Sequence, residues 1–243
     1  MKVEVIKMSR RKEFFMVLDT ETANSVNEPI PYDIGYAIAD RHGNIVTERS
    51  FVVAETFIDL KEAMNSAYYA EKIPKYWDDL KSGKRAMKSI FNIRKQMFAD
   101  MREYNVKKVG AYNMNFDRKA LNNAIRYHSK SFIRWFFPYG TEYFCIWNMA
   151  CQMILSTNTY IKFAEKNGFE SEKGNLLTNA EVCYKYIKKN IDFVESHTGL
   201  EDVKIEIEIL KKCFDQHKKM DRSIKPSCWR LPQKKRKELH ENA

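Results

Sequence analysis

Cysteine pairs are missing from this 243-residue sequence: its five cysteines are an odd number, lie far apart and include no CxxC motif. Such a set is not typical of a secreted protein held together by disulfides, so we predict free thiols in a reducing compartment. A zinc site built from Cys213, His217 and Cys228 is not expected, because this spacing fits no usual zinc pattern. The cysteines are Cys145, Cys151, Cys183, Cys213 and Cys228.

Long hydrophobic runs are also missing. No stretch approaches the ~20 apolar residues that a membrane-spanning helix needs, and the opening MKVEVIKMSRRKEFF holds no uninterrupted apolar segment of the kind found in signal peptides. Hydrophobic residues still make up 44% of the chain and aromatic residues 13%, which suffices for a core and argues against disorder. We therefore predict a soluble protein of the cytoplasm, or of the host cytoplasm if a phage encodes it, with no membrane partner.

Acidic residues are outnumbered. The chain carries 42 Lys and Arg against 32 Asp and Glu, a formal net charge of +10. This surplus favours a polyanionic partner, with nucleic acid the obvious candidate, although a merely basic surface would have the same composition. Residues 221–243 are rich in Lys and Arg and contain two prolines. This tail is either an electrostatic contact for nucleic acid or a solvated terminus.

Apolar and alternating stretches predict a sheet of five strands. The first, EFFMVLDT, precedes two stretches that are separated by a turn at Gly43, and these three are expected to form an antiparallel meander. Two further strands follow after a long helical segment. The predicted strands cover residues 13–20, 30–40, 44–53, 107–113 and 142–147.

Helical periodicity dominates the remaining sequence. A long pattern with apolar residues on one face covers residues 85–104, and another helix is expected to begin at Asn115 as its N-cap. Capping boxes predict helices that begin at Thr178 and at Thr198, the second being the last clear helix. Strands first, and then alternating helices and strands, are typical of an α/β fold with a mixed sheet flanked by helices.

We expect this arrangement to form one domain. It would cover residues 1–220, with an extra helical segment at about 60–105, and the basic tail over 221–243 would lie outside it. No internal repeat divides the chain further.

The end of the first predicted strand, VLDTET, carries two carboxylates one residue apart. Because side chains alternate along a strand, Asp19 and Glu21 project from the same side. Two like charges so close together repel each other, and burial increases the cost. The pair is therefore either an ordinary strand end that opens into water or the place of a cation.

Two later segments carry acids at the ends of regular elements. Asp117 lies in NMNFD, between a strand and a helix, and His197 and Asp202 lie in HTGLED, where a helix begins. Each has a structural alternative: an aspartate in a first turn stabilises the helix dipole, and Thr198 with Glu201 accounts for a capping box.

Taken together, four carboxylates from three segments match the needs of a two-metal phosphodiester site. Two divalent ions about 3.5–4 Å apart neutralise such carboxylates, activate a water and stabilise the leaving oxygen. Oxygen ligands favour Mg²⁺ or Mn²⁺. A neighbouring histidine with an ordinary pKa near ~6.5 can accept the proton of the water. This chemistry explains all five side chains at once.

These three segments resemble the exonuclease motifs of the DEDD superfamily, in its histidine-containing branch, which includes the epsilon proofreading subunit of bacterial DNA polymerase and ribonuclease T. Asp19 and Glu21 match the D-x-E motif. Asn113, Phe116 and Asp117 match N-x-x-F-D, and His197 and Asp202 match H-x-A-x-x-D. The departure is Gly199, where the pattern has alanine. The motifs bracket residues 17 to 202, which is most of the chain.

The resemblance implies a ribonuclease H-like fold and 3′→5′ exonucleolytic release of nucleoside monophosphates. Asp19, Glu21, Asp117 and Asp202 would hold two Mg²⁺ or Mn²⁺ ions, and His197 would be the general base. Substrate-binding roles would fall to Thr20 and Glu21, which meet the terminal nucleotide, and to Asn113. All of these are catalytic, metal or substrate-binding positions by resemblance only.

The motifs leave the substrate and the partners open. We expect the 3′ end of single-stranded DNA to be the substrate, with an exoribonuclease or RNA-trimming enzyme as the alternative, because the residues that read the 2′-hydroxyl cannot be identified. A catalytically idle nucleic-acid-binding module should lack one or more ligands, and this chain lacks none. A proofreading role would require a separate polymerase or replication partner. Three aromatic runs offer either stacking surfaces for bases or core packing: Tyr68-Tyr69, Tyr76-Trp77 and Trp135-Phe136-Phe137.

Overall fold

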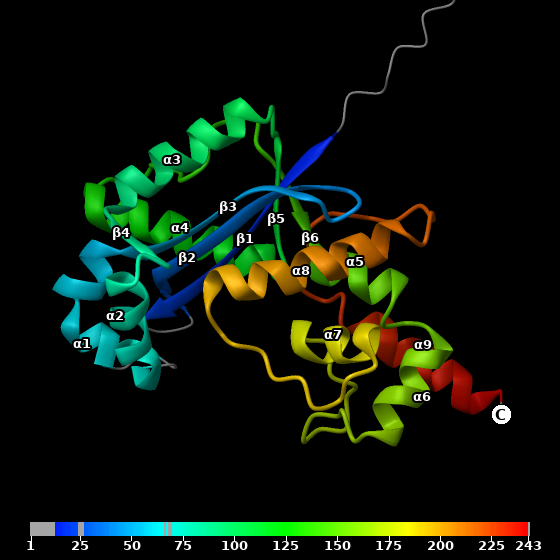
Figure 1. Cartoon of the computed structure of the whole chain (residues 1–243). Helices are drawn as coiled ribbons and strands as arrows, with labels where there is room; N and C mark the ends of the chain where they lie inside the picture. The colour runs from blue at the N-terminus through cyan, green and yellow to red at the C-terminus, as the bar shows by residue number, and fades with distance from the viewer. Residues whose placement is uncertain (1–12, 24–26, 66, 68–69, 243) are drawn as a thin grey trace, which may run out of the picture.

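The computed structural model describes residues 13–23, 27–65, 67 and 70–242, and it contains a mixed six-stranded sheet (Figure 1). Strands β1, β2 and β3 form an antiparallel meander, β5 and β6 continue the sheet parallel to β1, and β4 is an edge strand parallel to β3. The sheet order is β4-β3-β2-β1-β5-β6. The strands are β1 (Phe14–Ala23), β2 (Ile30–Asp40), β3 (Ile45–Val53), β4 (Ala86–Lys88), β5 (Lys108–Ala111) and β6 (Glu142–Cys145).

Helices cover both faces of this sheet (Figure 1). Helices α3 and α4 lie on one face, while α5 and α8 lie on the other, with α7 packed against α8. The helices are α1 (Lys61–Asn65), α2 (Ile73–Lys81), α3 (Ile90–Glu103), α4 (Met114–Ser129), α5 (Ile146–Met153), α6 (Asn158–Lys166), α7 (Ala180–Lys188), α8 (Gly199–Phe214) and α9 (Arg230–Glu241), together with a π-helical turn, η1 (Glu55–Asp59), and a 3₁₀ turn, η2 (Ala70–Lys72).

The central strand β1 is buried on both faces, and its alternation decides which side chains meet which helices. Phe15 and Val17 belong to the hydrophobic cluster under α5 and α8, whereas Met16 and Leu18 belong to the cluster under α3 and α4. Continuing the same alternation places Asp19 and Glu21 on the α8 side and Thr20 on the α4 side.

The start of α8 lies directly on the backbone of β2, at Gly35. A Cβ atom on Gly35 would stand 2.1 Å from the backbone nitrogen of Leu200, and one on Gly199 would stand 2.6 Å from the nitrogen of Gly35. No side chain fits between these backbones. Glycine at position 199, where the DEDD pattern has alanine, is therefore what this contact requires.

The expected α/β class and mixed sheet are confirmed, and each of the five predicted strands is present, but the sheet has a sixth strand, β4, that was not predicted. The helix predicted over residues 85–104 begins only at Ile90, with Ser89 as its N-cap. The residues before it form β4, which pairs with the end of β3. This three-residue strand is too short for an alternation signal, and it forms because the edge of β3 offers unpaired backbone groups.

Two predicted helix starts are displaced, and the helices α6 and α9 were not predicted. Helix α4 has Asn113 rather than Asn115 as its N-cap, and α7 has Asn179 rather than Thr178. Thr198 is the N-cap of α8, as predicted. A further helix, α9, follows within the basic tail, where the amide group of Gln233 exchanges hydrogen bonds with the backbone of Leu176 (2.9 and 3.1 Å).

The described residues also test what the sequence analysis predicted for the cysteines, for membrane-spanning helices and for the aromatic runs. All five cysteines are buried and unbridged, which confirms the predicted free thiols. Among the described helices, none is long and apolar enough to cross a membrane. The aromatic pair Tyr68 and Tyr69 lies outside the described residues, while Phe136 and Phe137 are buried and Trp135 is exposed.

The contact between α8 and β2 predicts a position-specific cost for an added methyl group. Gly35→Ala should lower the free energy of unfolding by about 3 kcal/mol, because the new Cβ would have to displace backbone rather than a flexible side chain. Gly83→Ala is the matched control: it has open space and costs only its positive φ of 75°, which is worth about 1–2 kcal/mol. Urea unfolding measures both, and equal losses would contradict the close approach.

Candidate active site and metal centre

The site lies where the end of β1 meets the first turns of α4 and α8. Asp19 of β1 pairs with Gly35 of β2, the glycine on which α8 rests. The β1–β2 pairing then shifts register between Glu21 and Thr22, an irregularity of the kind that often lies beside functional sites. The three motifs, which are far apart in the sequence, thus lie at one edge of the sheet.

Asp117 is held against β1 by Thr20. The Thr20 N–H and the Thr20 hydroxyl both donate to Asp117 Oδ1, at 3.1 and 2.9 Å. Asp117 is buried in the first turn of α4, as predicted, although the helix begins at a different cap. Because Asp117 occupies both donors of Thr20, the contact predicted between Thr20 and a terminal nucleotide would have to use another atom.

Two adjacent acids at the start of α8 have opposite surroundings. Glu201 accepts hydrogen bonds from the Thr198 hydroxyl (2.9 Å) and from Arg85 (2.9 Å), and it pairs with Lys84 (2.7 Å). Burial raises its pKa, but the hydrogen bond from Lys84 and the charge of Arg85 outweigh this and lower the pKa of Glu201 to about 2. Glu201 is therefore an ion-paired structural acid.

Asp202, by contrast, faces the site without a cation in direct contact among the described residues. Its carboxylate accepts hydrogen bonds from the Ser196 hydroxyl and from the Thr198 N–H, each at 3.1 Å. The amide that a capping box assigns to Glu201 is therefore bound by Asp202. Burial raises the pKa of Asp202 to about 7.

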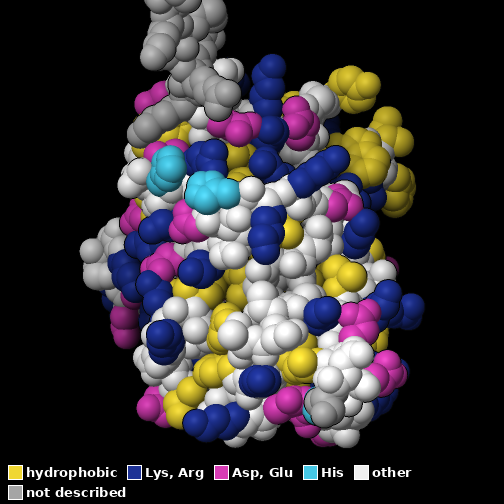
Figure 2. All heavy atoms as spheres, turned by 90° about the vertical axis from the view of Figure 1, so that its right-hand side faces the viewer, with side chains coloured by type: hydrophobic (Ala, Val, Ile, Leu, Met, Phe, Trp, Pro, Cys, Tyr) yellow, Lys and Arg dark blue, Asp and Glu magenta, His cyan; other side chains and the backbone are white. Residues whose placement is uncertain are grey.

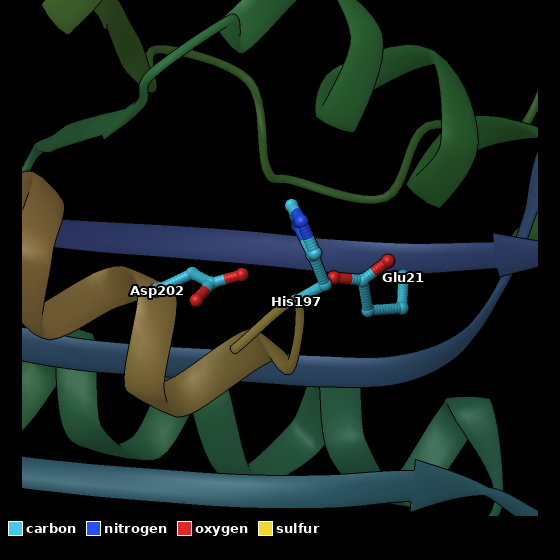
Figure 3. A group of neighbouring side chains, drawn as sticks. All are labelled: Glu21, His197 and Asp202. Carbon is cyan, nitrogen blue, oxygen red and sulfur yellow. The ribbon is translucent and has the colours of Figure 1, made fainter. Parts of the chain in front are cut away.

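Three of the predicted residues converge closely enough to share an ion. Ligand atoms of Glu21, His197 and Asp202 all lie within 4.8 Å of one another, where the start of α8 passes the end of β1 (Figure 3). A second group, also within 4.8 Å, joins His197 to Glu181 of α7 and to Glu195. The two groups meet at His197.

The acids of the site repel one another strongly. Burial, followed by the charge of Asp202, raises the pKa of Glu21 to about 8, and burial raises that of Asp117 to about 7. The pKa of Asp19 is raised well above its usual value by burial and then by Asp117, Glu21, Glu206 and Asp202. Like charges concentrated in this way favour either bound protons or bound cations.

The donor set fits hard divalent cations. Asp19 is only partly buried as a residue, but its Oδ2 atom is shielded from solvent and has no hydrogen-bond partner among the described residues; the same holds for Glu206 Oε2. A buried acceptor without a donor costs free energy. Carboxylate oxygens are the ligands that Mg²⁺ and Mn²⁺ prefer, so the residues present suit these ions.

Glu206 and Lys72 belong to the site although no motif predicted them. Glu206 is buried one helical turn beyond Asp202, so its spacing of four was a usable signal in the sequence. Lys72 of η2 donates from Nζ to the carbonyl of Ser196 at 2.7 Å, and its charge offsets part of the rise in the pKa of Glu21. No local pattern could have placed η2 here, because the contact spans more than a hundred residues.

His197 is placed as a neutral base. It has a positive φ of 49°, and its ring is half-buried. Burial, helped by the charge of Lys72, lowers the pKa of His197 below its usual value. Its Nδ1 atom lies 3.9 Å from Glu195 Oε2. Near neutral pH the imidazole is therefore mostly uncharged, which is the form that accepts a proton.

Asn113, the remaining predicted residue, lies at the N-cap position of α4 without a side-chain capping bond. It lines a pocket of about 600 Å³ together with Tyr112, Trp147, Thr178 and Trp229. Its amide therefore makes no capping bond to α4, and its substrate role stays a prediction.

Comparison with known proteins supports the fold. No family model matches the chain, and no curated protein matches it in sequence. The zinc-bound complex of E. coli exonuclease I with single-stranded DNA aligns with a TM-score of 0.50 at 13% identity, covering 84% of this chain and 42% of that one. The same enzyme with a dA16 oligonucleotide gives a TM-score of 0.49 at 14% identity, covering 83% and 40%.

The chain therefore spans less than half the length of the exonuclease I structures that it matches. At such identity the similarity is one of fold. The expected ribonuclease H-like fold, a mixed sheet flanked by helices, is confirmed by the first of these alignments.

The raised carboxyl pKa values predict an unusual pH dependence of stability. A carboxyl whose pKa is higher in the folded state binds its proton more tightly there, so its stabilising effect is lost as pH rises through the folded pKa. With Asp117 and Asp202 near about 7 and Glu21 near about 8, the metal-free protein should lose about 5 °C or more in Tm between pH 5.5 and pH 8.5.

Mg²⁺ should reverse this loss, and more strongly at pH 8.5 than at pH 5.5, because ions and protons compete for the same oxygens. Differential scanning calorimetry in EDTA and in Mg²⁺ measures both effects. The lowered pKa of Glu201 does not interfere, since it acts below about pH 4.5. A Tm that stays constant or rises over this range in EDTA would contradict the acidic cluster.

Proposed function

We propose that this chain is a metal-dependent 3′→5′ exonuclease of the DEDD superfamily, in its histidine-containing branch. It would remove nucleoside monophosphates from the 3′ end of single-stranded DNA. The observation that carries the proposal is the convergence of acids from three distant segments on one sheet edge. Two buried carboxylate oxygens there, Asp19 Oδ2 and Glu206 Oε2, have no hydrogen-bond partner among the described residues. The fold shared with exonuclease I supports the same class.

Asp19, Glu21, Asp117 and Asp202 would hold two Mg²⁺ or Mn²⁺ ions. When bound, such ions lower the pKa of water and stabilise the leaving oxygen. The protein's own part is geometric: the Thr20 donors orient Asp117, and the Ser196 hydroxyl with the Thr198 N–H orients Asp202. Fixed orientation keeps the ligands in place when charge develops on the phosphate.

His197 would accept the proton of the attacking water. The lowered pKa keeps its imidazole neutral near pH 7, and Lys72, bonded to the preceding carbonyl, holds the turn that carries it. Glu195 would then stabilise the protonated imidazole, since its carboxylate lies 3.9 Å from Nδ1.

Single-stranded DNA is the favoured substrate because the exonuclease I structure of the same fold is a complex with single-stranded DNA. An exoribonuclease or RNA-trimming enzyme of this fold is the alternative. Lys and Arg side chains are spread over the face that carries α9 (Figure 2), so the residues 221–243 stay a proposed electrostatic contact outside an exonuclease domain of residues 1–220. A separate polymerase partner also stays a prediction.

The direct test compares 5′-labelled single-stranded DNA, duplex DNA and RNA with Mg²⁺ or Mn²⁺. We expect a ladder that shortens by one nucleotide from the 3′ end, fastest on single-stranded DNA.

Asp202→Asn should slow cleavage at least about 100-fold, because loss of a ligand should exceed the 10–100-fold typical of its supporting contacts. Its matched control is the neighbour, Glu201→Gln, which removes an ion-paired acid from the same turn.

Glu201→Gln should lower stability while retaining cleavage within a few-fold, since Glu201 is paired with Arg85 and Lys84 and is not one of the proposed metal ligands. Equal loss of activity in Asp202→Asn and Glu201→Gln would show that the turn of α8, and not a ligand, had been damaged. No cleavage of any nucleic acid by the native chain would remove the proposal.

His197→Ala tests the base separately from the metal. The rate should fall about 10²–10⁴-fold, as is typical of removing a general base, while Mn²⁺ affinity measured by isothermal titration calorimetry should change little. The matched control is His217→Ala, since His217 has a similar positive φ of 50° but lies beyond the other end of α8. An unchanged rate in His197→Ala would assign proton transfer to another group.

A further inference from the structure

A basic and aromatic surface lies at the C-terminal end of α4, the helix that carries Asp117 in its first turn, and no motif accounts for it. Its exposed rings and aliphatic side chain lie at the end of α4 and in the segment that leads to β6: Tyr127 (56% exposed), Phe132 (92%), Ile133 (85%), Trp135 (59%) and Tyr139 (108%). We call these residues, together with Arg126, Lys130 and Arg134, the α4 platform. Exposed apolar side chains gathered in this way mark an interaction site.

The platform is held in place rather than loosely exposed. The Phe136 N–H donates to Asn122 Oδ1 at 2.9 Å, and the buried rings of Phe136 and Phe137 anchor the chain beside Trp135. On the other side, the carbonyl of Trp135 accepts a hydrogen bond from Arg94 at 3.3 Å. The ring of Trp135 is therefore presented to solvent by contacts on both sides of it.

Cations are interleaved with these rings. The guanidinium of Arg126 lies over the Trp135 ring at 4.7 Å, and its Nε donates to the carbonyl of Arg134 at 3.1 Å. Within the described part of the chain, neither of these arginines nor Lys130 forms a salt bridge. Positive charge beside flat exposed rings suits a polyanion that also carries stacking bases.

A pocket beside the platform lies close to the end of β1. It has a volume of about 620 Å³ and is lined by Glu28, Ile30, Asn123, Arg126, Tyr127, Lys130 and Phe132. Ile30 pairs with Ala23 of β1, two residues beyond Glu21. Asn123 Nδ2 donates to the carbonyl of Pro29 at 3.1 Å, so α4 forms one wall of the pocket.

The length of α4 fits a strand of nucleic acid that ends at the acids. From Asp117 to Arg126 is nine residues, or about 14 Å along the helix, which corresponds to about four stacked nucleotides at 3.4 Å each. We propose that the α4 platform binds the single strand upstream of the 3′ end, stacking its bases on Phe132 and Trp135. This rests on the proposed function, but it concerns a separate surface.

The platform predicts an affinity that depends on strand length. In a cleavage-free background, Asp202→Asn in EDTA, the added double change Phe132→Ala/Trp135→Ala should weaken binding of a 12-nucleotide strand at least about tenfold. Binding of a 3-nucleotide strand, which cannot reach the platform, should stay unchanged. Fluorescence anisotropy with 5′-labelled oligonucleotides measures both.

Charge and stacking can be separated by salt. Lys130→Gln/Arg134→Gln should flatten the plot of log K against log salt by about 1.4, or about 0.7 for each lost phosphate contact to a single strand, whereas the aromatic double change should leave the slope as it is. The matched control is Val46→Ala, an exposed apolar residue 38% accessible at the opposite end of the sheet, which should change neither quantity.

Unchanged binding of the 12-nucleotide strand by Phe132→Ala/Trp135→Ala would contradict a nucleic-acid-binding role of the α4 platform. The same holds if this variant loses only self-association of the chain or binding of a protein partner. Cleavage of the 3-nucleotide strand by the native chain distinguishes the exonuclease proposal from the platform proposal. If it proceeds, the exonuclease stands whatever the platform does. If the native chain cleaves nothing but binding still depends on the platform, the surface stands and the proposed chemistry fails.

Discussion

The first turn of α8 rests on the backbone of β2, and this contact decides where Asp202 and Glu206 lie relative to the acids of β1. Gly35 and Gly199 permit it, and the Gly199 N–H donates to Asp33 Oδ2 at 2.9 Å. Asp33 is in turn held by Arg85 in a fully buried ion pair, at 2.9 and 3.0 Å. Because this anchor fixes the start of α8 beside the end of β1, Asp202 is brought to Asp19 without any contribution from the acids themselves.

The same region therefore contains two kinds of buried acid. Asp33 and Glu201 share one arginine, and such paired acids support the structure, since breaking a buried pair is strongly destabilising. Asp19 and Glu206 have oxygens with no partner in the described part of the chain, and their like charges oppose folding. Acids that destabilise the fold they occupy are candidates for chemistry, because clustered pKa shifts concentrate at functional sites.

How much the sequence predicts depends on whether a feature is local. The alternation of β1 predicts Asp19 and Glu21 on one face, and the three motifs named five side chains that lie near one edge of the sheet. Lys72 was missed because its partner is distant in sequence. Strand β4 was missed because three residues are too few to show an alternation of apolar and polar side chains. The sequence left the role of Trp135 open between stacking and core packing. The structure shows that Trp135 is exposed whereas its neighbours Phe136 and Phe137 are buried.

The central claim is that the clustered carboxylates at the end of β1 form a two-ion site. Anomalous scattering from crystals of the protein grown with Mn²⁺ tests it most directly. We expect two peaks about 3.5–4 Å apart, between Asp19 and the carboxylates of Glu21, Asp117 and Asp202. Mn²⁺ bound only at Glu181 and Glu195, or absent from the edge of β1 at millimolar concentration, would contradict the claim.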